Sequence, residues 1–406
     1  MSGCATQQQA ICIRGLGLVT PLGQNLETSW QRIVEGASIV DHARAPVEGV
    51  SGIDRVSALG VRAAREACER AGWAVDRLRD PRTALVVGTS KGAVDEWIEW
   101  SRRLRQDVDR SNAQPQGSQL QDVAAPPSPS DNPLTWFSAA GDQPIGLHTV
   151  ATILAREIGL GCGPAATVSC ACATGPVALI RGAMLIRDDS ADRVLVVASE
   201  SSLHPLFIGS FTRLGVLARS GQGVRPLDCN RGGFLISEAA AAVCLERGHA
   251  QAGDVQIEQF ALGADATHLT GVDPQGRTLR ACLDRLIASQ PVDLIHAHAT
   301  GTALNDPIEL AAIDDAASRI ASARPHVYSH KAAIGHSLGA AGLVAVVLNC
   351  LMHQHGTIPG NINTTEPLAA KHIEIERAAR SRGIDRSVAI AAGFGGTVAG
   401  VTLISG

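Results

Sequence analysis

The residues best suited to nucleophilic chemistry lie in the stretch VSCACATG, residues 168–175. A short β-branched run precedes Cys172 and a long apolar segment with helical periodicity follows it, so we predict that Cys172 stands at a strand-to-helix junction. The N-terminus of a helix favours a thiolate, and its free backbone N–H groups can hold an oxyanion. The alternative interpretation is that Cys170 and Cys172 are two buried structural thiols.

Two histidines are candidate partners for such a thiol. His298 follows a buried strand in the sequence IHAHATGT, and His336 precedes a helix of small residues in GHSLGAAG. Both are expected at strand-to-helix turns of the C-terminal half, and a cysteine with a histidine is a common nucleophile-activating pair. By contrast, His353 and His355 lie near a predicted helix end, where a cation is favoured, and we interpret them as structural.

A glycine-rich stretch, AAGFGGT, comes near the end of the chain at residues 391–397. Its backbone can approach a ligand closely, and Phe394 is its one bulky side chain. A phosphate cradle is a weak interpretation, because no lysine follows as in a P-loop. The GLG sequence at residues 15–17 lacks the third glycine and the following helix of a dinucleotide site.

The elements that must position these residues alternate along the chain. Continuous apolar runs predict buried strands at 84–88, 193–198, 292–296 and 388–392, and periodic segments predict helices at roughly 55–71, 145–158, 172–187, 276–289, 305–320 and 337–354. This alternation predicts an α/β fold. The segment 172–187 is apolar almost all round and is predicted to be a buried central helix. Residues 101–133 are expected to form an insertion, polar and proline-rich over 111–133, which is a solvated, disordered loop, a lid or a partner contact.

Composition narrows the class of protein. A chain of 406 residues suits two packed halves, and a formal charge of -4 excludes a broad nucleic-acid surface. The sequence shows no apolar run of about 20 residues and no basic segment leading into an apolar stretch at the N-terminus, so neither a membrane span nor a signal peptide is expected. Ten cysteines without a CxxC pair fit a reduced, cytoplasmic setting.

In their order along the chain, these stretches resemble the β-ketoacyl-acyl-carrier-protein synthases of the thiolase superfamily, the elongating ketosynthases. IRGLGLVTPLG is similar to the family's first strand and turn, CACATG to its nucleophile turn, and VRPLDCNRGGF to its Arg-Pro-Phe-Asp segment. AHATGT, GHSLGAAG and GFGGT follow in the family's order. The resemblance covers nearly the whole chain except roughly residues 101–133.

The resemblance implies two similar five-stranded α/β halves, at about 1–248 and 249–406, packed in five layers as α-β-α-β-α. It implies that Cys172 takes an acyl chain from an acyl carrier protein as a thioester. His298 and His336 would then assist the decarboxylation of malonyl-carrier protein and stabilise the enolate. Attack of the carbanion on the acyl thioester would give a 3-ketoacyl product two carbons longer, in fatty acid or polyketide biosynthesis.

The resemblance also assigns supporting roles. The backbone N–H groups of Cys172 and Phe394 would form the oxyanion hole, and Phe394 would gate the acyl pocket. Lys331 and Glu309 would form an ion pair near the histidines. The substrate-binding residues, with the two threonines bonded to the phosphopantetheine arm, would be Thr300, Thr302 and Gly395. No metal or redox cofactor is required.

The implied partners are an acyl carrier protein and a second subunit. The family forms homodimers, and a heterodimer with a related subunit is the other arrangement considered. Residues 134–143 are our prediction for the segment that reaches the partner's pocket. Arg55, Arg62 and Arg65 share one face of a predicted helix, which either docks the acidic carrier or is an ordinary solvated face.

Two departures from the family pattern point to a specialised branch. Val398 ends GFGGTV where the family has asparagine, and SEAAA at 237–241 replaces a glycine-rich GEGAG. Neither change removes a catalytic group.

Four other functions share parts of this pattern. A thiolase needs a second cysteine near the glycine-rich loop, and none follows Cys350; an initiating synthase has asparagine where this chain has His336. A non-elongating partner subunit, similar to a chain-length factor, lacks the nucleophile that this chain keeps. A metal-binding scaffold using the HxH and CxC elements predicts stoichiometric metal in the purified protein.

Overall fold

A computed structural model of the chain describes residues 10–39, 45–50, 54–113, 146–219, 221–251, 253–288, 290–320 and 324–406. Ten strands of these ranges form one sheet in the order β3-β2-β4-β5-β1-β6-β12-β11-β7-β8. The first five in this order belong to the N-terminal half and the last five to the C-terminal half, as the resemblance implied. The halves meet where β1 pairs with β6 through Cys12–Gln256 and Ile13–Val255.

The two halves repeat one strand pattern. In each, two parallel pairs at the outer edge adjoin two antiparallel pairs toward the middle of the sheet. The N-terminal strands are β1 (Ala10–Val19), β2 (Thr83–Gly88), β3 (Ala165–Val168), β4 (Arg193–Glu200) and β5 (Ala239–Gly248). The C-terminal strands are β6 (Val255–Ala264), β7 (Leu294–His296), β8 (His326–Tyr328), β11 (Arg386–Ala392) and β12 (Thr397–Ser405). A separate pair is formed by β9 (Thr357–Ile358) and β10 (Arg380–Ser381).

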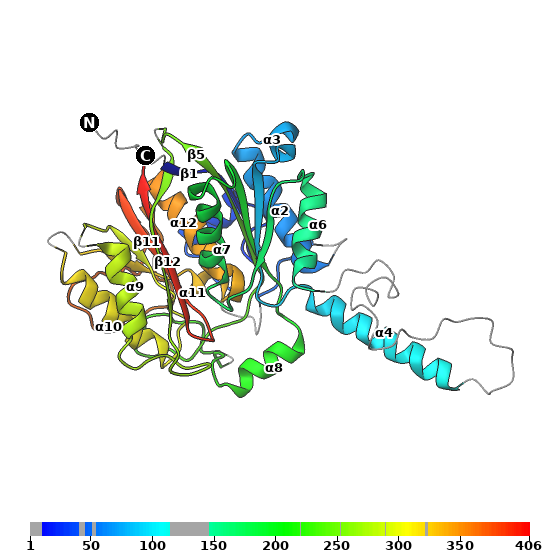
Figure 1. The fold of residues 1–406 in the computed structure, drawn as a ribbon. Coiled ribbons are helices and arrows are strands. Elements are labelled where there is room, and N and C mark those ends of the chain that lie inside the picture. The colour runs from blue at the N-terminus through cyan, green and yellow to red at the C-terminus, as the bar shows by residue number, and fades with distance from the viewer. Residues whose placement is uncertain are drawn as a thin grey trace, which may run out of the picture.

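Two apolar helices, α7 (Thr174–Arg187) and α12 (Ala341–His355), lie between the two halves of the sheet (Figure 1). They approach closely because both carry glycine at the crossing. A Cβ atom on Gly175 would lie 2.4 Å from the Leu343 nitrogen, and one on Gly342 would lie 2.3 Å from Pro176 Cδ. The predictions of a buried central helix at 172–187 and of a helix of small residues after His336 are confirmed.

The outer layers consist of α2 (Arg55–Arg70) and α6 (His148–Ile158) on the N-terminal half, and of α9 (Arg277–Ile287) and α10 (Asn305–Ala317) on the C-terminal half (Figure 1). The five-layer α-β-α-β-α arrangement is therefore confirmed. Shorter helices connect the layers: α1 (Leu26–Val34), α3 (Val75–Arg79), α8 (Pro205–Arg213), α11 (Lys331–Ile334) and the 3₁₀ turn Leu338–Ala340.

One stretch of the described residues, Leu338–His355, is long and apolar enough to cross a membrane by length and composition. It comprises the 3₁₀ turn and α12, and 83% of it is buried inside the molecule. Its apolar character is accounted for by the central layer that it forms.

The insertion predicted at residues 101–133 begins as a helix and not as a loop. Residues 101–113 belong to the helix α4 (Val94–Ala113), which projects away from the body of the molecule (Figure 1). Its first turn carries Asp95 and Glu96, which favour a helix N-terminus, and Glu99 pairs with Arg103 one turn later. The remaining residues of the insertion, and the segment 134–143, lie outside the described residues.

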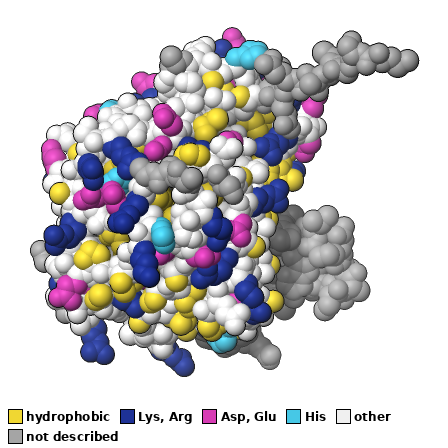
Figure 2. Space-filling model, turned by 90° about the vertical axis from the view of Figure 1, so that its left-hand side faces the viewer, with side chains coloured by type: hydrophobic (Ala, Val, Ile, Leu, Met, Phe, Trp, Pro, Cys, Tyr) yellow, Lys and Arg dark blue, Asp and Glu magenta, His cyan; other side chains and the backbone are white. Residues whose placement is uncertain are grey.

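Charged side chains of both signs are interspersed on the face formed by the C-terminal half (Figure 2). On the opposite half, the arginine face of α2 is only partly free. The guanidinium of Arg55 pairs with Glu238, whose side chain is 1% exposed, and Arg65 pairs with Glu157. The buried Glu238 also accepts hydrogen bonds from the Val47 N–H and from Ser201. Arg55 therefore fastens α2 to the sheet and is not available to dock a partner.

Candidate active site

The thiol of Cys172 is presented by a strained turn between β3 and α7. Ala171 has a φ of +48°, in the left-handed region that non-glycine residues rarely occupy. The side chain of Thr174 holds this turn, since its Oγ1 accepts from the Cys170 N–H at 2.8 Å and donates to the Ala171 carbonyl at 2.7 Å. Strain of this kind concentrates at functional sites, where surrounding contacts compensate for it.

The Sγ atom of Cys172 lies 3.3 Å from Nε2 of His336. Burial raises the pKa of the Cys172 thiol to about 11, although Lys91 and Lys331 act in the opposite direction. We expected the helix N-terminus to favour the thiolate; here burial outweighs the nearby positive charge. At neutral pH the thiol therefore keeps its proton, and His336 is the neighbouring group able to receive it.

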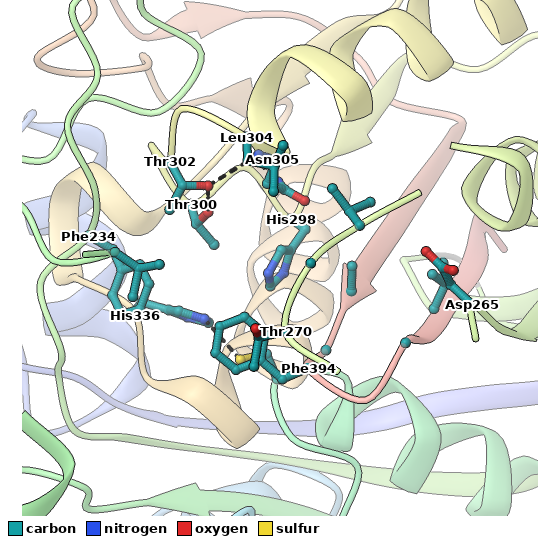
Figure 3. Close-up of a pocket in the computed structure, with 18 of the residues that line it drawn as sticks. Phe234, Asp265, Thr270, His298, Thr300, Thr302, Leu304, Asn305, His336 and Phe394 are labelled. Carbon is teal, nitrogen blue, oxygen red and sulfur yellow. Dashed lines mark hydrogen bonds between the residues drawn. The ribbon is translucent and has the colours of Figure 1, made fainter. Parts of the chain in front are cut away.

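The two candidate histidines lie together, with ring centroids 5.4 Å apart and nearly perpendicular planes (Figure 3). Burial holds the pKa of both His298 and His336 well below the ordinary imidazole value, so both rings are neutral. A neutral imidazole has one N–H donor and one bare nitrogen. Two such rings beside one thiol can donate hydrogen bonds to a developing oxyanion.

Lys331 and Glu309 do not form the expected ion pair with each other. They bind opposite sides of the same main-chain segment. The Nζ atom of Lys331 donates to the His298 carbonyl oxygen, and the Glu309 carboxylate accepts the N–H groups of His298 at 2.6 Å and Ala299 at 2.7 Å. Burial lowers the pKa of Lys331 and raises the pKa of Glu309. The backbone of His298 is thus held from both sides by buried charged groups.

The glycine-rich loop between β11 and β12 lies against the nucleophile turn. A Cβ atom on Gly393 would lie 2.8 Å from the Cys170 carbonyl oxygen and 3.2 Å from the Cys172 nitrogen, so only glycine fits there. The ring of Phe394 packs 6.2 Å from that of Phe211 and lies within the apolar cluster that includes Cys172. The N–H of Gly395 donates to the Leu269 carbonyl at 2.7 Å, so this predicted substrate-binding group already has a partner.

A single cavity brings most of the predicted residues together: Cys172, His298, Thr300, Thr302, His336 and Phe394 all line it (Figure 3). The hydroxyls of Thr300 and Thr302 lie 3.1 Å apart. Gly395, Lys331 and Glu309 do not belong to the lining. Residues that the sequence reasoning missed also line it: Phe211, Val216, Phe234, Asp265, Thr270, Gly271, Val272, Leu304 and Asn305. The rest of the lining, Ala392, Gly393, Gly396 and Val398, belongs to or adjoins the glycine-rich stretch that the sequence had marked.

One of these missed residues had a signal in the sequence, because Phe234 ends the VRPLDCNRGGF motif. The loop 265–272 carries no motif that would have marked it. Its place at the cavity follows from tertiary contacts, such as the hydrogen bond from the Asp265 N–H to the Gly396 carbonyl at 2.7 Å.

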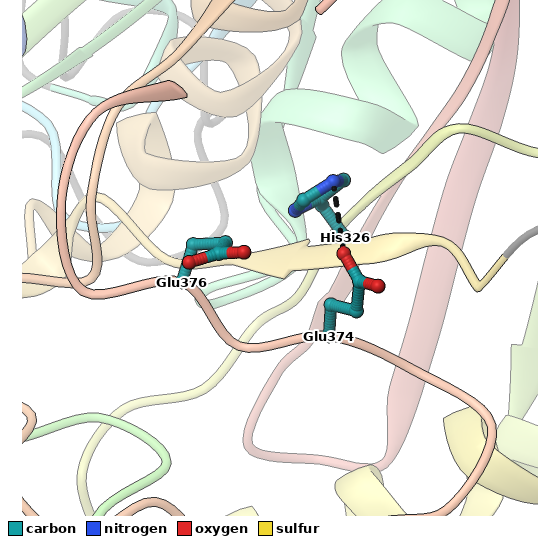
Figure 4. A group of neighbouring side chains, drawn as sticks. All are labelled: His326, Glu374 and Glu376. Carbon is teal, nitrogen blue, oxygen red and sulfur yellow. Dashed lines mark ion pairs between the residues drawn. The ribbon is translucent and has the colours of Figure 1, made fainter. Parts of the chain in front are cut away.

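A group of potential metal ligands lies outside this cavity: His326, Glu374 and Glu376 (Figure 4). Arg380 already pairs with both carboxylates, through contacts of 2.6 Å to Glu376 and 3.6 Å to Glu374. A cation would have to displace this guanidinium, so the group is accounted for as an ion-pair cluster that holds the segment 374–376 against the sheet edge at β8.

The fold and the site together are those of the thiolase superfamily, in which two duplicated α/β halves bring a cysteine thiol beside two imidazoles. Residues 46–251 match the family "Beta-ketoacyl synthase, N-terminal domain", and residues 255–365 match "Beta-ketoacyl synthase, C-terminal domain". The chain belongs to the β-ketoacyl synthase family and is a condensing acyltransferase.

The similarity to known proteins extends over almost the whole chain. A 3-oxoacyl-[acyl-carrier-protein] synthase 2 of Coxiella burnetii is 27% identical and covers 96% of this chain and 97% of its own length. The ketoacyl synthase alpha subunit of the tetracenomycin polyketide synthase of Streptomyces glaucescens is 28% identical over 96% of this chain and 95% of its own. Among solved structures, the ishigamide ketosynthase/chain length factor shares the fold with a TM-score of 0.80, at 24% identity, over 98% of this chain and 100% of that one.

Proposed function

We propose that this chain is a 3-oxoacyl-[acyl-carrier-protein] synthase that joins a malonyl unit to an acyl group held on Cys172. The observation that carries the proposal is the contact between Cys172 Sγ and His336 Nε2 at 3.3 Å, in a cavity that His298 also lines. The names of similar proteins in both fatty acid and polyketide synthesis support the reaction class.

In the first step the Cys172 thiol attacks the thioester of an acyl-carrier protein. Its proton passes toward His336 as the new S–C bond forms, and the carrier's sulfur leaves as a thiol with that proton. Because burial keeps the pKa of the thiol high, a nearby base is needed for this transfer. The N–H groups of Cys172 and Phe394 would hold the tetrahedral oxyanion.

In the second step malonyl-carrier protein loses carbon dioxide. The electrons of the broken C–C bond move onto the thioester oxygen as an enolate, which His298 and His336 stabilise through N–H donors. The carbanion attacks the acyl carbon, the C–S bond to Cys172 breaks, and the thiolate takes up one proton from solvent, which balances the negative charge brought in by the malonyl carboxylate. We propose that this sequence of steps requires no metal or redox cofactor.

The supporting residues position the catalytic groups and the substrate. Lys331 and Glu309 hold the main chain of His298, and the hydroxyls of Thr300 and Thr302 would bind the phosphopantetheine arm that carries the substrate. Phe394 would gate the acyl pocket through its packing in the apolar cluster beside Cys172.

We further propose an acyl carrier protein as partner, a homodimer or a heterodimer with a related subunit, and a cytoplasmic setting. Similar folds support these partners: one solved neighbour, 22% identical with a TM-score of 0.79, is described as a type II PKS acyl-carrier protein in complex with its ketosynthase. We also propose the division of the chain into halves at residues 248 and 249. It is supported by the end of β5, the last N-terminal strand along the chain, at Gly248 and by the start of β6, the first C-terminal strand, at Val255.

In the experiment, the purified protein is incubated with malonyl-carrier protein and with a panel of acyl-carrier proteins that differ in the length of the acyl chain. We expect release of carbon dioxide and a 3-ketoacyl product two carbons longer, and His298→Ala should remove the product while leaving acyl loading of Cys172 intact. Loading or decarboxylation without elongation at every chain length would favour the alternative function, a non-elongating partner subunit.

A further inference from the structure

Two buried histidines outside the proposed mechanism, His296 and His330, are joined by a hydrogen bond of 2.8 Å between Nε2 of His296 and Nδ1 of His330. Both side chains are fully buried. His296 is the last residue of β7, two residues before His298. His330 directly precedes Lys331 and caps α11. The pair therefore links the two strand ends from which His298 and Lys331 emerge.

The direction of the hydrogen bonds follows from Asn349 on α12. Its Nδ2 donates to the Ser387 hydroxyl at 3.2 Å and to the Val388 carbonyl at 3.4 Å, and a carbonyl oxygen can only accept. The Oδ1 of Asn349 must therefore face His296 Nδ1, which lies 2.8 Å away and has to donate.

Burial keeps His296 neutral by lowering its pKa to about 3, so its ring carries one proton, on Nδ1. Nε2 of His296 is then an acceptor, and Nδ1 of His330 must carry the proton of the bond between them. Burial lowers the pKa of His330 as well. Its Nε2 is consequently bare, and it has no hydrogen-bond partner among the residues that the structure describes.

The outer end of the network gives the same direction independently. The Ser405 hydroxyl donates to the Ile384 carbonyl at 2.9 Å, so its oxygen accepts from His353 Nδ1, 2.9 Å away. Burial lowers the pKa of His353 to about 4, which leaves its Nε2 bare to accept from the Ser387 hydroxyl at 2.9 Å. Ser387 is thus free to accept from Asn349. Every donor therefore meets one acceptor throughout the hydrogen-bond network, from His330 to Ile384.

The His330 end of this hydrogen-bond network lies next to the site. His330 precedes Lys331, whose Nζ donates to the carbonyl oxygen of His298, and His298 lies two residues after His296. The contacts thus close a ring through His296, His298, Lys331 and His330. A neutral, fully directed network of this kind has one low-energy arrangement of protons, and it holds side chains at fixed positions.

We propose that His330 and His296 are positioning residues that keep His298 and Lys331 in register for the condensation step. The proposal deepens the proposed function and rests on it. His330 acts through the hydrogen bond that its Nδ1 donates to His296. His296 in turn is fixed to α12 by its hydrogen bond to Asn349.

The test compares two substitutions of His330. In His330→Asn, the amide Nδ2 takes the place of Nδ1 and can still donate to His296, whereas His330→Leu cannot. We expect His330→Leu to slow condensation by about tenfold to a hundredfold, as misplaced catalytic groups do, with acyl loading of Cys172 unchanged. His330→Asn should restore condensation to within a few-fold of the wild type. His372→Leu, at an exposed position outside the cavity, is the matched control.

A positioning role is overturned if His330→Leu condenses at the wild-type rate, if loading falls as much as condensation, or if His330→Asn is as slow as His330→Leu. If the leucine variant does not fold, nitrogen-15 NMR of histidine-labelled wild type decides: Nδ1-protonated neutral tautomers of His296, His330 and His353 are required, and an Nε2-protonated or charged His330 contradicts the chain. A wild type that forms no Cys172 adduct would refute the proposed function, while the NMR measurement would still test the network.

Discussion

Nε2 of His336, from the C-terminal half, lies 3.3 Å from Sγ of Cys172, from the N-terminal half. The contact crosses between the duplicated halves, beside the close packing of α7 on α12: α7 begins two residues after Cys172, and α12 begins five residues after His336. Neither half holds the pair alone. The reactive centre is therefore a product of how the halves pack.

The high pKa of the Cys172 thiol predicts slow, strongly pH-dependent alkylation. Since the thiolate reacts and the thiol does not, the rate with iodoacetamide should rise about tenfold per pH unit between about pH 7 and pH 10, with no plateau below the pKa of about 11. The measurement follows the peptide that carries Cys172 by mass spectrometry, in a Cys170→Ala background that removes the neighbouring thiol. A plateau reached by about pH 8 would show a low-pKa thiolate instead.

Substitution of Gly393 should damage the site more than the fold. In Gly393→Ala the new Cβ would press on the Cys170 carbonyl and the Cys172 nitrogen, so the loop or the nucleophile turn must move. We expect acyl loading to fall by about tenfold or more, with a loss of stability of about 1–3 kcal/mol. Gly209→Ala on α8 is the control, because its Cβ would meet nothing within 4 Å. Unchanged loading in Gly393→Ala would rule out the tight contact.

The raised pKa of the Glu309 carboxyl predicts a specific pH dependence of the free energy of unfolding. Burial raises its pKa in the folded state to about 7, above the ordinary value of 4.5, so the folded protein binds a proton more tightly than the unfolded chain. Stability from this group is full below the ordinary value and is lost as the pH rises through about 7. Glu309→Gln, which cannot ionise, should lack this loss.

Denaturation of both proteins at about pH 5 and about pH 7.5 checks this directly. The wild type should lose stability relative to Glu309→Gln over this interval. Glu27→Gln, at an exposed position on α1, should differ equally from the wild type at both values. A constant difference between the wild type and Glu309→Gln would show that Glu309 ionises normally.

Removal of the Phe394 ring should alter the choice of acyl chain. The ring packs against Phe211 in the cluster beside Cys172, so Phe394→Ala opens space next to the thiol. We expect the ratio of loading rates for long over short acyl chains to rise several-fold, since each methylene in an apolar pocket is worth about 1–3 kcal/mol. Competition between two acyl-carrier proteins measures the ratio, and Leu262→Ala on the exposed face of β6 is the control. An unchanged ratio would show that Phe394 does not control access to the acyl pocket.

Local sequence pattern predicted the alternating strands and helices and the turn at Cys172 well, because buried strands and central helices carry strong apolar periodicity, whereas the five layers were implied by the family resemblance. The helix predicted at 172–187 begins at Thr174, since the strained residue Ala171 forms a turn first. The helix α4 extends past residue 101 because its charged residues pair along its surface, which an apolar pattern does not report.

The rest of the site depends on distant segments that come together only in the folded chain. The contact of Lys331 with the His298 carbonyl, where an ion pair with Glu309 was expected, is one example. The bond from the Gly395 N–H to Leu269, a residue with no motif, is another. Burial, which follows from the whole fold, sets the pKa of Cys172 against the expectation from its place at a helix N-terminus.

The central claim is that Cys172 carries the acyl group, and intact-protein mass spectrometry tests it most directly. The wild type incubated with acyl-carrier protein should gain the mass of one acyl group, and peptide mapping should locate it on Cys172. Cys170→Ala should gain the same mass, and Cys172→Ala should gain none. An acyl adduct of equal yield in Cys172→Ala, or none in the wild type with any acyl chain, would contradict the account.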